Sequence, residues 1–217
     1  MSQIQNEKVL KSVSSNIPFN VSNYSITETT NKIYIIGGLQ FNDHKDYFQI
    51  YDKRKDTWFL EKPLPIPVSY HTSVLFDNKI YVIGGENKNN QPCNNLQIYD
   101  LSTNTWSEGL SLLYNVMKHS SIVFNDKIYV IGGINDERIL NDISSYDIHS
   151  DKWSLESTLN FERYNHFSTI FSNTIYIYGG FNSIGQLLKD EIYNTEQNYC
   201  LFVPIEIRPE GIKRSIE

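Results

Sequence analysis

The sequence predicts an all-β fold of four similar four-stranded sheets, arranged as a β-propeller. A run of apolar residues that ends in two glycines occurs four times, and the first glycines, Gly37, Gly84, Gly132 and Gly179, lie 47, 48 and 47 residues apart. A fixed period of this size is typical of repeat architectures. β-Branched and aromatic residues in each run favour a strand over a helix. Each repeat then has room for four strands, which is the unit of a propeller.

The first two strands of each repeat are expected to form a hairpin. A strand of alternating side-chain character, such as 71–76, is followed by a two-residue polar turn, and the four turns are Thr30-Asn31, Asp77-Asn78, Asn125-Asp126 and Ser172-Asn173. Asn and Asp tolerate the left-handed backbone of tight hairpins. The glycine-ended run is the second strand. Its second glycine, Gly38, Gly85, Gly133 or Gly180, permits a backbone turn that a side chain would block.

The third and fourth strands are expected to form a second hairpin. The third strand ends in Tyr-Asp or Tyr-Asn, at 49–52, 97–100, 145–147 and 191–194. Six residues after the Asp stands Trp58, Trp106 or Trp153, and we assign Tyr199 to this position in the fourth repeat. We expect the indoles to pack between neighbouring sheets and the Asp side chains to cap the turns that follow them.

These elements divide the chain into a repeat region and two flanking segments. The repeat region is 21–203, with repeats at about 21–62, 68–110, 116–157 and 163–203. Residues 1–20 form an N-terminal segment. Within it, 9–18 is expected to be the eroded end of an earlier repeat, because Ile17 precedes Tyr24 by the offset that separates Leu64 from His71. Residues 204–217 form a polar tail.

The number of repeats does not decide whether the blades form a closed ring. The four blades close tightly, or they remain a partial, open ring, or the open edges pair with another chain, or the chain is the remnant of a longer protein. An incomplete ring exposes sheet edges, which proteins normally cover.

The order of hairpin strand, Gly-Gly, Tyr-Asp and Trp at constant offsets resembles the kelch repeat, over about residues 21–203. The resemblance implies a platform that binds a protein partner. In adaptor members the partner contacts residues just before the first strand and just after the glycine pair. Transferred by position, this binding face comprises Asn23, Tyr24, Leu39, Tyr70, His71, Glu86, Lys118, His119, Ile134, Asn165, His166 and Phe181.

The same resemblance suggests a role near ubiquitin ligases. Many kelch proteins carry BTB and BACK domains that recruit a cullin ubiquitin ligase, and this chain is similar to their propeller without those domains, as in poxviral or protist relatives. It implies a scaffold, a decoy or a substrate-recognition part related to cullin adaptors. The arginines that one branch uses for acidic peptides are replaced here by Asn23, Tyr70, Lys118 and Asn165.

Composition excludes several other classes of function. A formal net charge of -6 without a basic block disfavours nucleic-acid binding. The chain has two cysteines, without zinc spacing. No apolar run has the length of a signal peptide or a membrane span, so we expect no membrane partner and a cytoplasmic location.

Catalytic and metal chemistry are not expected. His71, His119 and His166 invite a zinc site, but equivalent positions on separate sheets lie about 10 Å apart, so we expect structural hydrogen bonds from them instead. We predict no catalytic residue, no metal and no cofactor. The alternative is a kelch-fold enzyme of the oxidase or sugar isomerase type with a site at the propeller centre, for which Cys93 and Cys200 are poorly placed.

Overall fold

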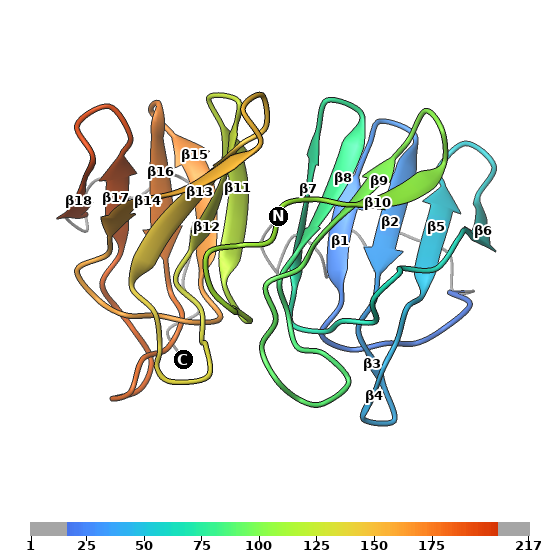
Figure 1. Cartoon of the computed structure of the whole chain (residues 1–217), viewed down its shortest axis with the longest axis horizontal. Coiled ribbons are helices and arrows are strands. Elements are labelled where there is room, and N and C mark those ends of the chain that lie inside the picture. Colours follow the sequence, from blue (N-terminus) through green and yellow to red (C-terminus); the bar gives the residue numbers. More distant parts are fainter. Residues whose placement is uncertain (1–16, 204–217) are drawn as a thin grey trace.

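The computed structural model describes residues 17–203, and these residues form eighteen β-strands and no helix. Sixteen of the strands make four antiparallel four-stranded sheets, here called blades 1 to 4 (Figure 1). The predicted all-β propeller of four blades is confirmed. The part of the chain that the structure describes has no helix that is long and apolar enough to span a membrane.

The strands of each blade lie in chain order. Blade 1 consists of β1 (Ser25–Glu28), β2 (Lys32–Ile36), β5 (Phe48–Asp52) and β6 (Thr57–Leu60). Blade 2 consists of β7 (Thr72–Phe76), β8 (Lys79–Ile83), β9 (Leu96–Asp100) and β10 (Thr105–Glu108). Blade 3 consists of β11 (Ser120–Phe124), β12 (Lys127–Ile131), β13 (Asp142–Asp147) and β14 (Lys152–Thr158). Blade 4 consists of β15 (Phe167–Phe171), β16 (Thr174–Tyr178), β17 (Glu191–Asn194) and β18 (Tyr199–Phe202).

The strands of the blades lie within the ranges given above for the repeats, except that β14 ends at Thr158, one residue beyond the third range. A small additional hairpin, β3 (Leu39–Gln40) with β4 (Asp43–His44), lies in the loop after the first glycine pair and was not expected. The predicted eroded repeat at 9–18 lies outside the described residues except for Ile17 and Pro18, as does the polar tail at 204–217.

The first hairpins turn as their residues predict in three blades. Both central residues have positive φ in the pairs Asp77-Asn78, Asn125-Asp126 and Ser172-Asn173. Such turns match the twist of the two strands that they join. In blade 1 the turn residues Thr30 and Asn31 do not adopt positive φ. There the last ladder pair is Glu28 and Ile33, and Thr29 and Lys32 close the turn: Thr29 N–H donates to the Lys32 carbonyl at 2.9 Å, and Lys32 N–H donates to the Thr29 hydroxyl at 3.0 Å.

The Tyr-Asp carboxylates cap the second hairpins. Asp100 Oδ1 accepts hydrogen bonds from the backbone N–H groups of Ser102 and Thr103, at 2.8 and 3.2 Å. Asp52, Asp147 and Asn194 accept the equivalent pairs of bonds in the other blades. These bonds hold the pKa of Asp100 below its usual value. The predicted turn-capping role is confirmed.

The space between blades is filled by apolar side chains, with the indoles at its outer edge. Trp106 packs against Phe48 of blade 1, with ring centroids 5.3 Å apart, and its Nε1 donates to the Lys62 carbonyl at 2.9 Å. Trp153 lies in the cluster between blades 2 and 3 and donates to the Leu110 carbonyl at 2.8 Å. The packing role predicted for these two indoles is confirmed.

The assignment of Tyr199 to the tryptophan position is wrong. In β17 and β18 the residue opposite Tyr193 is Cys200, just as Trp153 is opposite Tyr146. Tyr199 is 40% exposed, whereas Cys200 packs against the cluster between blades 3 and 4. The pairing register, in which successive residues face opposite sides of the sheet, decides the position.

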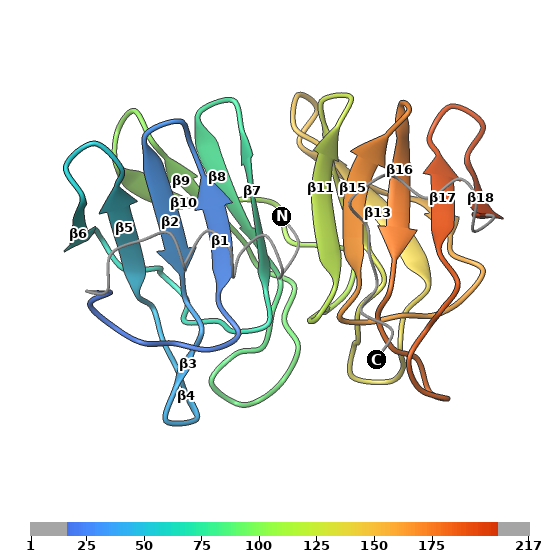
Figure 2. The ribbon, with the colours of Figure 1, turned by 180° about the vertical axis from the view of Figure 1, so that it is seen from behind.

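The blades lie side by side through their inner strands. β1 contacts β7, β7 contacts β11, and β11 contacts β15. Figure 2 shows the four strands in this order, with β7 and β11 between β1 and β15. Among the described residues, no contact of the same extent joins β15 back to β1.

Candidate binding face

The residues just before the inner strands are joined across blades by backbone hydrogen bonds. Tyr70 N–H donates to the Asn23 carbonyl, Lys118 N–H to the Tyr70 carbonyl, and Asn165 N–H to the Lys118 carbonyl, each at 2.9 Å. The four residues therefore form a continuous arc at one end of the propeller. We call this end, together with the residues that follow the glycine pairs, the end face.

All four residues of the arc have left-handed backbones. Their φ values are 53° for Asn23, 52° for Tyr70, 56° for Lys118 and 51° for Asn165. Asn adopts this conformation readily, whereas Tyr and Lys do so at a cost. The cross-blade hydrogen bonds offset this cost, because they fix the backbone at each position regardless of its side chain.

The residues after the glycine pairs lie beside the arc. Isolated β-bridges join Leu39 to Ser22, Glu86 to Ser69, Ile134 to Met117 and Phe181 to Tyr164. The bridges place the segment after each glycine pair against the segment that precedes the inner strand of the same blade. Phe181 is 42% exposed, while Leu39, Glu86 and Ile134 are half-buried. Glu86 Oε1 lies 3.1 Å from His44 Nε2 of the β3–β4 hairpin, and this contact connects blades 1 and 2.

A pocket of about 150 Å³ opens at the end face. Its walls include eight of the twelve residues predicted for the binding face, together with Phe167: Asn23, Tyr24, Tyr70, His71, Lys118, His119, Asn165 and His166. The structure therefore brings residues of all four blades to one concave surface. The transferred positions form one surface, although they are spread over 159 residues from Asn23 to Phe181.

The accessible charge at the pocket comes from Lys118. Its Nζ lies 4.6 Å from the centroid of the Tyr70 ring, within the range of a cation–π contact. The pair joins blade 2 to blade 3 across the mouth of the pocket. Amide side chains flank it, from Asn23 on one side and Asn165 on the other. Such a surface presents one cation, one aromatic ring and two amides to a ligand.

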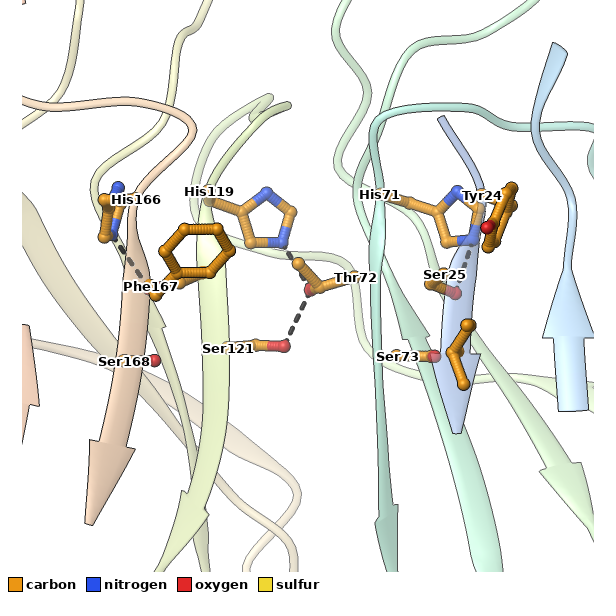
Figure 3. Close-up of a pocket in the computed structure, with 12 residues that line it drawn as sticks. Tyr24, Ser25, His71, Thr72, Ser73, His119, Ser121, His166, Phe167 and Ser168 are labelled. Atoms are coloured by element: carbon orange, nitrogen blue, oxygen red, sulfur yellow. Dashed lines mark hydrogen bonds between the residues drawn. The ribbon is translucent and has the colours of Figure 1, made fainter. Parts of the chain in front are cut away.

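The three histidines of the predicted face are buried and hydrogen-bonded. His71 Nε2 pairs with Ser25 Oγ, His119 Nε2 with Thr72 Oγ1, and His166 Nε2 with Ser120 Oγ, each at 2.8 Å. Figure 3 shows the three imidazoles in a row across the inner strands. They are 4 to 5% exposed. Their predicted structural role is confirmed, so they form the base of the pocket and do not project from it.

Burial keeps these imidazoles neutral. Desolvation lowers the pKa of His71 and of His119 to about 3, and it lowers the pKa of His166 well below its usual value. Each histidine bonds to a different blade. No group of three His, Cys, Asp or Glu side chains suited to a metal occurs among residues 17–203.

Hydroxyl groups line the inner strands, and sequence reasoning missed them. Thr27 Oγ1 pairs with Ser73 Oγ, and Ser121 Oγ donates to Thr72 Oγ1, both at 2.7 Å. Thr72, Ser73 and Ser121 border a second pocket of about 150 Å³ at the propeller centre, together with Ser25, Ser120 and Ser168. The signal was present, because Ser or Thr stands one and two residues after His71 and His119. In blade 4, Phe167 stands directly after the histidine.

Blade 4 also contains a fully buried ion pair that the sequence did not reveal. Arg163 Nη2 donates to Glu191 Oε1 at 2.6 Å, and both side chains are 0% exposed. Glu191 Oε2 accepts from Asn160 N–H at 2.7 Å. Val68 and Val116 precede the histidines of blades 2 and 3 by the same three residues as Arg163. In blade 2, Gln97 contacts the backbone of Ile66 as Glu191 contacts that of Asn160.

The chain was compared with models of known protein families. Residues 4–180 match the family model described as the KLHDC2/KLHL20/DRC7 Kelch-repeats domain. No curated protein matches the chain. The matched segment covers 177 of the 217 residues and contains the whole of blades 1 to 3, with β15 and β16 of blade 4.

Proposed function

Because the chain belongs to the kelch-repeat family of β-propellers, we propose that it is a non-enzymatic module whose protein partner docks on the end face. The kelch-repeat domain is generally a protein-interaction module. One observation supports the end face as the docking site: the hydrogen-bonded arc of Asn23, Tyr70, Lys118 and Asn165 lines a pocket.

The chemistry of the arc supports a protein ligand. Tyr and cationic side chains held on a rigid frame contribute strongly to protein–protein binding. The amides of Asn23 and Asn165 can both donate to and accept from a peptide backbone. Lys118 favours a ligand that carries a carboxylate or a carbonyl oxygen opposite its Nζ. The net charge of -6 favours such a ligand over a polyanion such as nucleic acid.

We further propose that the chain acts in the cytoplasm as a scaffold, a decoy or a substrate-recognition part related to cullin ubiquitin ligase adaptors. The family resemblance and the absence of a long apolar run support this role. A decoy would bind the same partner as an adaptor and protect it. Overexpression of the chain is then expected to lengthen the half-life of the partner, whereas a substrate-recognition part would shorten it.

Partner capture followed by substitution tests the end face. The immobilised chain is used to isolate a partner from cytosol, and the affinity of the purified pair is measured by titration calorimetry. The double variant Tyr70→Ala/Lys118→Ala is expected to lower the affinity by about 30-fold, since hot-spot residues contribute about 2 kcal/mol or more. Lys55→Ala is the matched control, because Lys55 is exposed in the β5–β6 turn at the opposite end of blade 1.

The affinities can be compared only if the variants are folded, so the unfolding midpoint of each variant is measured as well. Both variants are expected to retain the unfolding midpoint of the unmodified chain, because the backbone bonds of the arc do not involve these side chains. An affinity that is unchanged by the Tyr70/Lys118 variant and reduced by Lys55→Ala would move the binding site to the other end of the propeller.

A further inference from the structure

The three junctions between blades share one set of backbone hydrogen bonds. The second glycine of each pair donates its N–H to the next blade, from Gly38 to the Val68 carbonyl, from Gly85 to that of Val116, and from Gly133 to that of Arg163, each at 2.8 Å. The arc of the end face adds a second bond at each junction. Each junction thus consists of two backbone hydrogen bonds. The glycine N–H of one blade donates to a carbonyl of the next blade, and the arc N–H of the next blade donates to the arc carbonyl of the first.

Blade 1 and blade 4 each have one donor and one acceptor at the positions that form junction bonds in the other blades. In blade 4, the Gly180 N–H and the Asn165 carbonyl occupy the positions that bond onward in blades 1 to 3. In blade 1, the Val21 carbonyl and the Asn23 N–H occupy the positions that bond backward in blades 2 to 4. None of these four groups makes the corresponding bond within residues 17–203. The two halves are complementary to each other.

The first glycine of blade 4 lacks the neighbour that the others have. A Cβ built at Gly37, Gly84 or Gly132 would lie 2.5 Å from a carbonyl oxygen of the next blade. At Gly179 the backbone is similar, with φ of +68°, but no described atom lies within 4 Å of such a Cβ. Blade 4 therefore has a glycine at a position where no residue between 17 and 203 makes the close approach that occurs at the other three glycines.

Blade 1 carries the apolar set of a junction on the side away from blade 2. Val21, Ile33, Ile35, Tyr51 and Trp58 form one cluster, and their counterparts in blade 2 form the core with blade 1. The Trp58 Nε1 is buried and has no hydrogen-bond partner among residues 17–203, whereas Trp106 and Trp153 donate to a carbonyl beyond the fourth strand of the preceding blade.

The side chains that would meet at this fourth junction have changed together. At each of the three junctions in the chain a histidine bonds to a hydroxyl group of the preceding blade. At the histidine position blade 1 has Tyr24, and at the hydroxyl position blade 4 has Phe167. A polar pair is replaced on both sides by aromatic rings, which pack well against each other.

One position of blade 4 departs from the apolar pattern. Asp190 stands where Phe48, Leu96 and Ile143 face the next blade. Its Oδ2 accepts a hydrogen bond from the Tyr176 hydroxyl at 3.0 Å, so the carboxylate has a partner within its own sheet. The departure makes this side of blade 4 more polar than the corresponding sides of blades 1 to 3.

We infer that two copies of the chain close one ring, in which blade 4 of each copy forms a junction with blade 1 of the other. The two junctions are identical and related by a two-fold axis, as a head-to-tail contact requires if it is to close. Two sets of four blades give an eight-bladed ring, within the usual range of about four to eight. The second copy provides the carbonyl for Gly180, the N–H for Asn165 and the close neighbour of Gly179.

Light scattering after size exclusion tests the assembly. The unmodified chain is expected to approach twice the mass of one chain as its concentration rises through the micromolar range. Gly179→Asn is expected to remain monomeric with an unchanged melting temperature, because Asn tolerates positive φ and its side chain clashes only in the assembled ring. A monomer at all concentrations, or open oligomers larger than two, would overturn the inference.

The same substitution inside the chain provides the matched control. Gly37→Asn places a side chain against the Val68 carbonyl within one chain, and it is expected to lower the melting temperature strongly. If Gly179→Asn lowers the melting temperature as much as Gly37→Asn at concentrations where the unmodified chain is monomeric, the close neighbour of Gly179 lies within the same chain, and the two-copy ring is wrong.

A disulfide experiment separates two copies from one chain that closes on itself. Asn23→Cys and Asn165→Cys are placed on separate chains in a background without Cys93 and Cys200, mixed, and oxidised. Tyr70→Cys/Lys118→Cys on one chain is the positive control, since these residues have the same relationship within the molecule. A covalent dimer is expected in the mixture. Closure of the control without a dimer in the mixture would overturn the inference, as would a cross-link that forms only when both new cysteines are on one chain.

Discussion

His119 of blade 3 is hydrogen-bonded through Nε2 to the Thr72 hydroxyl of blade 2, at 2.8 Å, and its imidazole is buried and neutral. The same relationship occurs at the other two junctions in the chain. A charged imidazole at these positions would have to be desolvated between two blades without an acidic partner. The folded state therefore excludes a proton that the unfolded state readily accepts.

Stability is expected to fall with acidification between about pH 6.5 and pH 3. The pKa of His119 is about 3 in the folded chain and about 6.5 when exposed. Below pH 6.5 the unfolded state binds more protons, so each such histidine removes about 1.4 kcal/mol per pH unit until the folded pKa is reached, and removes nothing above pH 6.5. Urea unfolding across this range measures the slope. His119→Gln is expected to make it shallower, and a slope unchanged by the substitution would show that His119 is not neutral and buried.

Trp106→Ala is expected to lower the free energy of unfolding by about 3–5 kcal/mol, because the indole fills space between blades 1 and 2. This is a large part of the stability of a domain, so cooperative unfolding is expected to be lost or strongly weakened. Trp106→Phe keeps a ring but removes the bond to the Lys62 carbonyl, and about 1 kcal/mol is expected. Chemical denaturation followed by far-UV circular dichroism measures both, and melting of the Ala variant like the unmodified chain would contradict the packing role.

The buried Arg163–Glu191 pair gives a prediction with an internal control. Glu191→Gln leaves the Arg163 guanidinium without its carboxylate, and Arg163→Val leaves the carboxylate without its cation, so each is expected to cost about 3–5 kcal/mol. The double variant places Val and Gln where blade 2 has Val68 and Gln97. It is expected to recover most of the loss, as measured by urea unfolding. Additive losses in the double variant would show that the two side chains do not act as a pair.

Gly85→Ala tests the close approach at the end face. With φ of +106° and an added Cβ 2.6 Å from the Ser69 carbonyl oxygen, alanine is expected to cost about 2 kcal/mol or more. Gly109→Ala is the comparison, because the atoms that crowd a Cβ there belong to the side chains of Leu96 and Ile98, which can move. Equal melting temperatures for the two variants would remove the special role of the glycine pair.

The repeat made most of the fold predictable, since each strand was identified from four copies and not from one. The place of a hairpin turn could be predicted where the turn residues are types that tolerate positive φ, as Asp77 and Asn78 are. Prediction failed in the fourth repeat, where Tyr199 lies five residues after Asn194; the six-residue offset that separates Asp147 from Trp153 leads from Asn194 to Cys200, as the pairing register shows. The β3–β4 hairpin was missed because the loops after the glycine pairs share no sequence pattern, although a single β-bridge occurs at the corresponding place in each of the other three blades.

The grouping of residues predicted for a binding face could be foreseen from the repeat, whereas the burial of its histidines could not. Offsets from the glycine pairs brought Tyr70, Lys118 and Asn165 to one surface. The same offsets selected His71, His119 and His166, whose burial depends on hydroxyl groups that belong to other blades and lie 46 or 47 residues away in the chain. The Arg163–Glu191 pair was missed for the same reason, because two charged residues that are 28 positions apart reveal nothing of their contact until the blade is assembled.

In the arc of Asn23, Tyr70, Lys118 and Asn165, the side chains are available to contact a ligand, while the backbone makes the hydrogen bonds between blades. Main-chain bonds hold each of these positions, so a new side chain there alters what a ligand meets and leaves the junction beneath it intact. Substitutions at these four sites are therefore expected to leave the blades intact where the new residue tolerates the left-handed backbone.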